Sequence, residues 1–178
     1  MCGICAFFDP ELKDKDCAIQ GMMDTIKHRG PSSDGKYTND KVALGFRRLS
    51  IIDLRGGSQP IFNEDKSRAI IFNGEIYNHR ELRDKLIKEG KADNFRGTSD
   101  TEVLLELFES YGVKAGIQMC KGMFAIALYD KQNKELFLLR DRVGEKPLYY
   151  GWVNDSFVFA SDIGCIAALD DFHNEINK

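Results

Sequence analysis

The sequence lacks the features that mark several classes of protein. Its 178 residues contain no apolar run near the roughly 20 residues that a membrane-spanning helix needs. With 25 Lys and Arg against 28 Asp and Glu, a net charge of −3 gives no general attraction to nucleic acid or to anionic membranes. No basic stretch precedes the first apolar residues, so no secretory leader is predicted. A globular chain with 43% apolar residues remains, long enough to bury a core.

Cysteines are few and irregularly spaced. They are Cys2, Cys5, Cys17, Cys120 and Cys165. An odd number in a chain of this length indicates reduced thiols and a cytoplasmic location rather than a disulfide framework. Cys2 and Cys5 have Cys-X-X-Cys spacing, but a zinc site needs about four ligands and no second pair is present. A thiol redox protein using these two residues remains a minor alternative, and no metal site is predicted.

The spacing of apolar residues changes along the chain. Helical spacing predicts helices at about 16–28, 78–90 and 99–112, and a short last helix at 162–169. Short apolar or alternating runs predict strands at 3–8, 42–46, 69–72, 123–129, 135–139, 148–153 and 157–160. Because helices are grouped and the last strands follow one another in hairpins, we expect one α+β domain over residues 1–178, with mainly antiparallel sheets.

Cys2 is the strongest candidate for a catalytic residue. Its small side chain favours removal of Met1, which would leave the Cys2 thiol beside a free α-amine. An α-amine ordinarily has a pKa of about 8 and a thiol of about 8.5, so the amine can accept the thiol proton near neutral pH. One residue then supplies both nucleophile and base. Taken alone, position 2 is better explained as a small residue that opens a strand.

Three further positions carry groups that acyl transfer to an amino acid requires. Asn73 and Gly74, placed at the end of the strand predicted at 69–72, offer a side-chain amide and a backbone N–H to a developing oxyanion. An ordinary Asn-Gly turn is the alternative. Arg48 can hold a carboxylate through its planar guanidinium. Asp100 either receives an ammonium or only favours the start of its own helix.

Eight sequence blocks in order identify a family resemblance. They are Met1-Cys2-Gly3-Ile4, His28-Arg29-Gly30-Pro31, the six residues from Arg48, Gln59-Pro60, the six residues from Asn73, Ser99-Asp100-Thr101-Glu102, the four residues from Gly122 and the ten residues from Arg140. This arrangement closely resembles the glutamine amidotransferase domain of glutamine-hydrolysing asparagine synthetases, which are class II, N-terminal nucleophile amidotransferases. It covers residues 1 to about 170. The resemblance implies a four-layer αββα sandwich with two stacked, mainly antiparallel sheets.

The resemblance also implies a reaction and a set of site residues. The reaction is hydrolysis of L-glutamine to glutamate and ammonia through a thioester on Cys2, with Asn73 and Gly74 as the oxyanion hole. Arg48 would hold the α-carboxylate of glutamine, and Asp100 would receive its α-ammonium. The remaining substrate-binding residues implied are Leu49, Ser50, Ile51, Ile52 and Glu75.

For the rest of the enzyme, the resemblance implies a synthetase domain that this chain does not contain. That domain, in cis or in trans, would bind ATP and magnesium and pass ammonia to activated aspartate, whereas the glutaminase domain needs no cofactor. L-Glutamine and the synthetase domain are the expected partners, with no nucleic acid or membrane, and a homodimer is one arrangement to consider.

Two alternatives stay open, and the sequence departs from the family at one point. Another class II amidotransferase with a different nitrogen acceptor is one alternative, although residues 73–79 and 141–150 favour the asparagine synthetase type. A non-catalytic glutamine-binding or regulatory module is the other, if Met1 is retained. Ser32 follows Pro31 where relatives usually place an acidic residue, so the loop expected over the glutamine site differs in charge.

Overall fold

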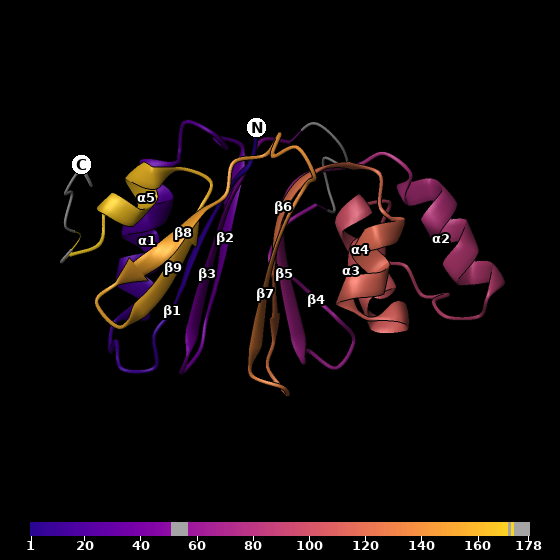
Figure 1. Cartoon of the computed structure of the whole chain (residues 1–178), viewed down its shortest axis with the longest axis horizontal. Helices are drawn as coiled ribbons and strands as arrows, with labels where there is room; N and C mark the ends of the chain where they lie inside the picture. The colour runs from indigo at the N-terminus through magenta and orange to yellow at the C-terminus, as the bar shows by residue number, and fades with distance from the viewer. Residues whose placement is uncertain (51–56, 171, 173–178) are drawn as a thin grey trace.

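Two antiparallel sheets stack face to face between two layers of helices (Figure 1). The structure is a computed structural model that describes residues 1–50, 57–170 and 172. The elements are β1 (Gly3–Phe8), α1 (Lys15–Thr25), β2 (Ser33–Thr38), β3 (Val42–Arg48), β4 (Ile61–Phe62), β5 (Arg68–Ile76), α2 (His79–Lys88), α3 (Asp100–Tyr111), α4 (Val113–Met119), β6 (Gly122–Asp130), β7 (Glu135–Arg140), β8 (Tyr149–Val153), β9 (Ser156–Ala160) and α5 (Ile163–Ala167).

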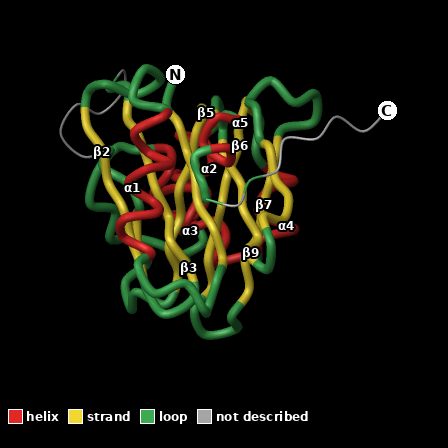
Figure 2. Tube along the Cα trace, turned by 90° about the vertical axis from the view of Figure 1, so that its left-hand side faces the viewer, coloured by secondary structure: helices red, strands yellow, loops and turns green. Residues whose placement is uncertain are grey.

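The strand orders show how distant parts of the chain meet. The first sheet has the order β2-β3-β1-β9-β8 and the second β4-β5-β6-β7. α1 and α5 cover the outer face of the first sheet, and α2, α3 and α4 cover that of the second (Figure 1). Figure 2, which looks onto the α1 side, shows this helix lying over the strands. The predicted α+β sandwich of four αββα layers is confirmed.

The central strands are buried on both faces. Successive strand residues point to opposite sides, so Ile4 and Ala6 of β1 pack between the sheets, whereas Cys5 and Phe7 pack under the α1 layer. All four are at most 1% exposed. This explains why β1 reads as a continuous apolar run without alternation. It also places Cys2, which packs against the layer between the sheets, and Cys5 on opposite faces.

Three elements escaped prediction. β2 (Ser33–Thr38) is a largely polar edge strand without apolar alternation, and β4 (Ile61–Phe62) has only two residues. α4 (Val113–Met119) begins immediately after Gly112, which was correctly predicted to end α3 and which has a φ of 78°. Gly116 inside α4 lets it pack against Phe108, since a Cβ there would lie 2.9 Å from the ring. Propensity alone disfavours a helix with an internal glycine, and tertiary packing overrides it.

The predicted place of Asn73 and Gly74 at a strand end is wrong. Both lie inside β5, paired with Ala125 and Phe124 of β6. A Cβ on Gly74 would come within 2.1 Å of the Met123 carbonyl oxygen, so the close approach of the two strands requires glycine here. The Asn-Gly turn is thereby excluded, and the pair is fixed by sheet pairing instead of by a loop.

Candidate active site

A cavity of about 190 Å³ is lined by the first two residues of the chain and by residues of both sheets. Its lining residues are Met1, Cys2, Phe46, Arg48, Leu49, Gly57, Gln59, Phe72, Asn73, Gly74, Glu75, Ser99, Asp100, Thr101, Met123 and Lys146. Seven predicted site residues are among them: Cys2, Arg48, Leu49, Asn73, Gly74, Glu75 and Asp100. Ser50 is not in the wall, and its backbone N–H donates to Ser32 Oγ at 3.2 Å. Ile51 and Ile52 lie outside the described residues.

The Cys2 thiol is held where β1 and β3 come together. Its Sγ accepts a hydrogen bond from the Leu49 N–H at 3.4 Å and lies 3.7 Å from the Leu49 carbonyl oxygen, to which it can donate. The register of the two strands causes this, because Gly3 pairs with Arg47 and Leu49 follows directly after β3. Arg29 Nε donates to the Cys2 carbonyl oxygen at 3.3 Å. The backbone on both sides of the thiol is therefore fixed.

Asn73 reaches across from the second sheet to the first. Its side chain is almost fully buried, and Nδ2 donates to Ser161 Oγ at 3.4 Å. The same hydroxyl oxygen accepts from the Ile4 N–H at 3.1 Å. An amide nitrogen carries two hydrogens, so Asn73 keeps one for a ligand in the cavity. Sequence reasoning missed Ser161, whose only signal was its position directly after the last predicted strand.

Positive and negative side chains approach the cavity from different elements. Arg48, at the end of β3, is 6% exposed and lies against Gly57, where a Cβ would be 2.4 Å from Nη2. Asp100, the first residue of α3, accepts from the Ile76 N–H at 3.0 Å. Burial raises the pKa of Asp100, and the charge of Glu75 adds to this effect, against hydrogen bonds that lower it. A ligand cation would therefore favour the charged carboxylate.

Gln59 is part of the cavity wall, and the sequence analysis assigned it no role of its own. Its buried side chain accepts from the Phe72 N–H at 2.6 Å and donates to the Phe72 carbonyl oxygen at 3.2 Å. It also donates to Thr101 Oγ1 at 3.3 Å, so it ties β5 to the start of α3. The residue appeared only within the Gln59-Pro60 block of the family resemblance. Its amide positions the elements that carry Asn73 and Asp100.

Lys146 is another residue of the wall with no predicted role. It is 6% exposed, and its Nζ lies 3.2 Å from the Met1 sulfur, which accepts a hydrogen bond from it. A cation thus lies beside the first residue of the chain, and both line the cavity.

The structure gives less support to a thiol redox pair or a metal site. All five cysteines are free thiols, and Cys2 and Cys5 are separated by the sheet, which disfavours a redox pair. Within residues 1–50, 57–170 and 172, no three His, Cys, Asp or Glu side chains gather as metal ligands would. In the same ranges, no helix has the length and apolar character to cross a membrane.

Comparison with known proteins agrees with the geometry. A family described as a glutamine amidotransferase domain matches residues 1–178. Asparagine synthetase [glutamine-hydrolyzing] 1 of Bacillus subtilis is 45% identical over 91% of this chain and 26% of its own length. Asparagine synthetase [glutamine-hydrolyzing] 2 of Arabidopsis thaliana is 41% identical over 94% of this chain and 28% of its length. The chain thus spans about a quarter of these relatives.

Solved structures support the fold independently. The glutamine phosphoribosylpyrophosphate amidotransferase of B. subtilis superposes with a TM-score of 0.79 at 21% identity, over 93% of this chain and 43% of that one. A structure titled as the allosteric regulatory enzyme of purine biosynthesis gives 0.80, also at 21% identity, over 93% and 43%. These two show the fold only. The family match leads to one conclusion: the chain belongs to the glutamine amidotransferase domain family.

Proposed function

We propose that this chain hydrolyses L-glutamine to glutamate and ammonia through a glutamyl thioester on Cys2. The observation that carries the proposal is the meeting of Cys2, Asn73, Arg48 and Asp100 around one cavity. At about 190 Å³ the cavity is smaller than the roughly 300–1,000 Å³ typical of drug-sized ligands, which suits a single amino acid.

The charges of the wall match a zwitterionic substrate. Arg48 would hold the α-carboxylate, and Asp100 with Glu75 would hold the α-ammonium, which restores the negative charge that burial disfavours on Asp100. With both charged groups of the α-carbon fixed, the side-chain amide can be directed towards Cys2. Positioning of this kind lowers the entropic cost of the reaction.

The proposed chemistry requires the free N-terminus of Cys2. The α-amine takes the thiol proton, and the sulfur attacks the amide carbon to give an oxyanion that Asn73 Nδ2 and the Gly74 N–H stabilise. The C–N bond then breaks, the protonated α-amine returns its proton to the leaving group, and ammonia departs. Water attacks the thioester, which releases glutamate and the thiol. In the unprocessed chain the nitrogen of Cys2 is a peptide nitrogen without a basic lone pair, so this form is proposed to be inactive.

The ammonia would be passed to a second domain. The relatives are named asparagine synthetases, and this chain matches about a quarter of their length. We propose that a synthetase domain, joined in cis or supplied in trans, receives the ammonia and transfers it to ATP-activated aspartate. The alternative of another acceptor is tested by adding candidate synthetase domains separately.

Release of glutamate and ammonia by the processed protein tests the proposal. Loss of Met1 is first confirmed by intact mass. We expect hydrolysis by the wild type, no hydrolysis by Cys2→Ala, and unchanged hydrolysis by Cys17→Ala, which removes an exposed cysteine of α1. Equal rates in Cys2→Ala and wild type would refute the nucleophile. Glutamine binding without turnover by processed protein would favour the regulatory module.

A further inference from the structure

The loop between β7 and β8 is held by its own residues from two sides. The carboxylate of Asp141 accepts four backbone N–H groups, from Phe124 at 3.2 Å, Val143 at 3.2 Å, Glu145 at 2.8 Å and Lys146 at 3.0 Å. Burial alone would raise the pKa of Asp141, but these hydrogen bonds outweigh it and lower the pKa, so the carboxylate stays charged.

Arg140 fixes the same loop through its carbonyl groups. Nε donates to the Lys146 carbonyl oxygen at 2.7 Å and Nη2 to that of Gly144 at 2.8 Å. Gly144 has a φ of 71°, and a Cβ there would lie 2.8 Å from the Arg140 guanidinium, so only glycine fits without strain. The loop thus holds the backbone of Lys146, two residues after Gly144, in one defined position, and glutamine hydrolysis as proposed above uses none of this.

In that position the Lys146 ammonium has only a weak hydrogen-bond acceptor among the described residues. Among the described residues, the acceptor that the structure gives it is the Met1 thioether at 3.2 Å. Neutral sulfur is a weak acceptor, whereas a buried ammonium ordinarily has a carboxylate or several oxygen partners. Removal of Met1 takes this acceptor away. A positive charge then remains in the wall of the cavity that Cys2 also lines.

We infer that Lys146 acts on the reaction through its charge. Its ammonium keeps the N-terminal amine of the processed chain unprotonated, and the amine can therefore accept the proton of the Cys2 thiol. The inference rests on the proposed function. The physical reason is repulsion between like charges: protonating an amine near a buried cation costs more than protonating it in water. The same field favours a thiolate and the oxyanion that follows it.

The other charges around the N-terminus modify this field. Arg29 from the segment after α1 and Arg48 from β3 add positive charge, whereas Glu75 of β5 and Asp100 of α3 oppose it. The carboxylate of bound glutamine would offset Arg48, and its ammonium would offset the two acids. Lys146 and Arg29 then remain, and Arg29 is directed to the Cys2 carbonyl oxygen. We therefore expect the effect of Lys146 to persist with substrate bound.

The test compares processed wild type with Lys146→Met, Lys146→Gln and Lys146→Arg, and with Lys131→Met as a control at an exposed position in the turn between β6 and β7. Two readouts are taken between pH 5 and 9. One is kcat/KM for glutamine hydrolysis. The other, which needs no turnover, is the rate of iodoacetamide alkylation at Cys2, measured by peptide mass so that Cys17 is distinguished.

We expect removal of the charge to move the acid limb of both profiles to higher pH by about one unit, because the amine and thiol then keep their protons longer. Lys146→Arg and Lys131→Met should overlay the wild type. Lys146→Gln provides the neutral variant if Lys146→Met does not fold.

Two results would overturn the inference. In the first, the wild type is active and kcat/KM of both neutral variants is reduced by the same factor at every pH. In the second, Lys146→Arg shifts the acid limb as far as Lys146→Met does. A shifted alkylation profile in a wild type that hydrolyses no glutamine would support the electrostatic role and contradict the proposed function. Failure of the two proposals is therefore distinguishable.

Discussion

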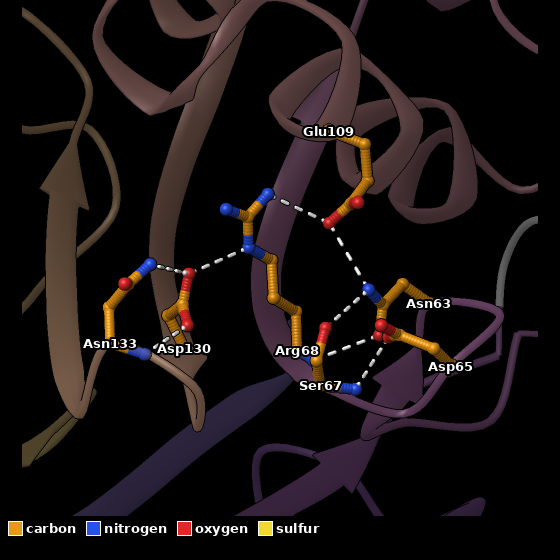
Figure 3. A network of polar contacts seen from close by, with 7 residues as sticks. All are labelled: Asn63, Asp65, Ser67, Arg68, Glu109, Asp130 and Asn133. Carbon is orange, nitrogen blue, oxygen red and sulfur yellow. Dashed lines mark hydrogen bonds and ion pairs between the residues drawn. The ribbon is translucent and has the colours of Figure 1, made fainter.

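The cavity and the polar network around Arg68 contain the same kinds of side chain, yet their groups are paired to different degrees. In the network, Arg68 Nε donates to Asp130 at 2.9 Å and Nη1 to Glu109 at 2.8 Å (Figure 3). Asp130 also accepts from the backbone N–H of Asn133 at 2.9 Å and from its side chain at 3.1 Å. Asn63 accepts from the Arg68 N–H at 2.8 Å.

The pKa shifts of the aspartates in the two regions have opposite signs. Burial would raise the pKa of Asp130, but its hydrogen bonds with Asn133 and Arg68 outweigh burial and lower it. The pKa of Arg68 is raised, because its two acidic partners outweigh the effect of burial. In the cavity, the pKa of Asp100 is raised by burial.

The difference indicates what each region does. Charges that are matched inside the protein stabilise the fold and leave little for a ligand. In the cavity, the disfavoured charge of Asp100, the second amide hydrogen of Asn73 and the weakly held ammonium of Lys146 all retain capacity for a ligand or a reacting group. Perturbed groups of this kind gather at functional sites.

Replacing one asparagine of each region by alanine should produce the largest contrast between the effects on kcat and on stability. Asn73→Ala removes the proposed oxyanion donor, and we expect kcat to fall by about 100- to 1,000-fold. Asn63→Ala breaks hydrogen bonds with Ser67 and Arg68, so the free energy of unfolding should fall by about 1–3 kcal/mol with kcat unchanged. Steady-state kinetics and urea unfolding of both variants measure this. A loss of kcat in Asn63→Ala at full stability would remove the distinction.

The two arginines provide a second comparison. Arg48→Met should raise KM for glutamine by about 10- to 100-fold, since a charge-assisted contact to the carboxylate is lost. Arg68→Met leaves Asp130, whose side chain is 4% exposed, without its cation, so we expect a loss of about 2 kcal/mol of stability. KM should be unchanged in Arg68→Met. An unchanged KM in Arg48→Met would show that the carboxylate binds elsewhere.

The two aspartates should respond to amide substitution with opposite signs in stability. The charged form of Asp100 is disfavoured in the folded chain, so Asp100→Asn should preserve or increase the free energy of unfolding at pH 7 while weakening glutamine binding. Asp130→Asn should lower that free energy, because its charged form is favoured in the folded chain. Urea unfolding and calorimetric titration with glutamine measure the two effects. Destabilisation by both substitutions would mean that Asp100 is structural.

Acid should remove the contribution of Asp130 to the free energy of unfolding, and we expect this to be the smallest of the effects. A carboxylate with a lowered pKa stabilises the fold above its unfolded pKa of about 3.9, and this stability is lost as pH falls through the lower, folded pKa. The difference in unfolding free energy between wild type and Asp130→Asn should therefore shrink below about pH 4. A difference that is constant from pH 7 to pH 2 would contradict a charge-based role.

The sequence predicted the elements whose signals are local and missed the contacts that are not. β1 (Gly3–Phe8) is a continuous apolar run and α3 (Asp100–Tyr111) starts at the predicted cap Ser99, so both were predicted to within a residue. The polar edge strand β2 has no apolar pattern, because only pairing with β3 defines it.

The residues of the site divide in the same way, into those with a local signal and those placed by distant contacts. Cys2, Arg48, Asn73 and Asp100 were found through chemistry and family resemblance, and the structure places them around one cavity, while their individual roles stay predictions. Ser161 and Gln59 act through partners 88 and 13 residues distant. No spacing rule connects residues brought together only by the stacking of two sheets.

Rapid acid quenching of processed protein mixed with glutamine shows directly whether a thioester forms on Cys2. Peptide mass analysis then shows whether a glutamyl group is attached and where. We expect one glutamyl group on the N-terminal peptide that contains Cys2, during turnover only, and none on Cys2→Ala. Release of glutamate at an undiminished rate by Cys2→Ala, with no modified N-terminal peptide in the wild type, would contradict a thioester on Cys2.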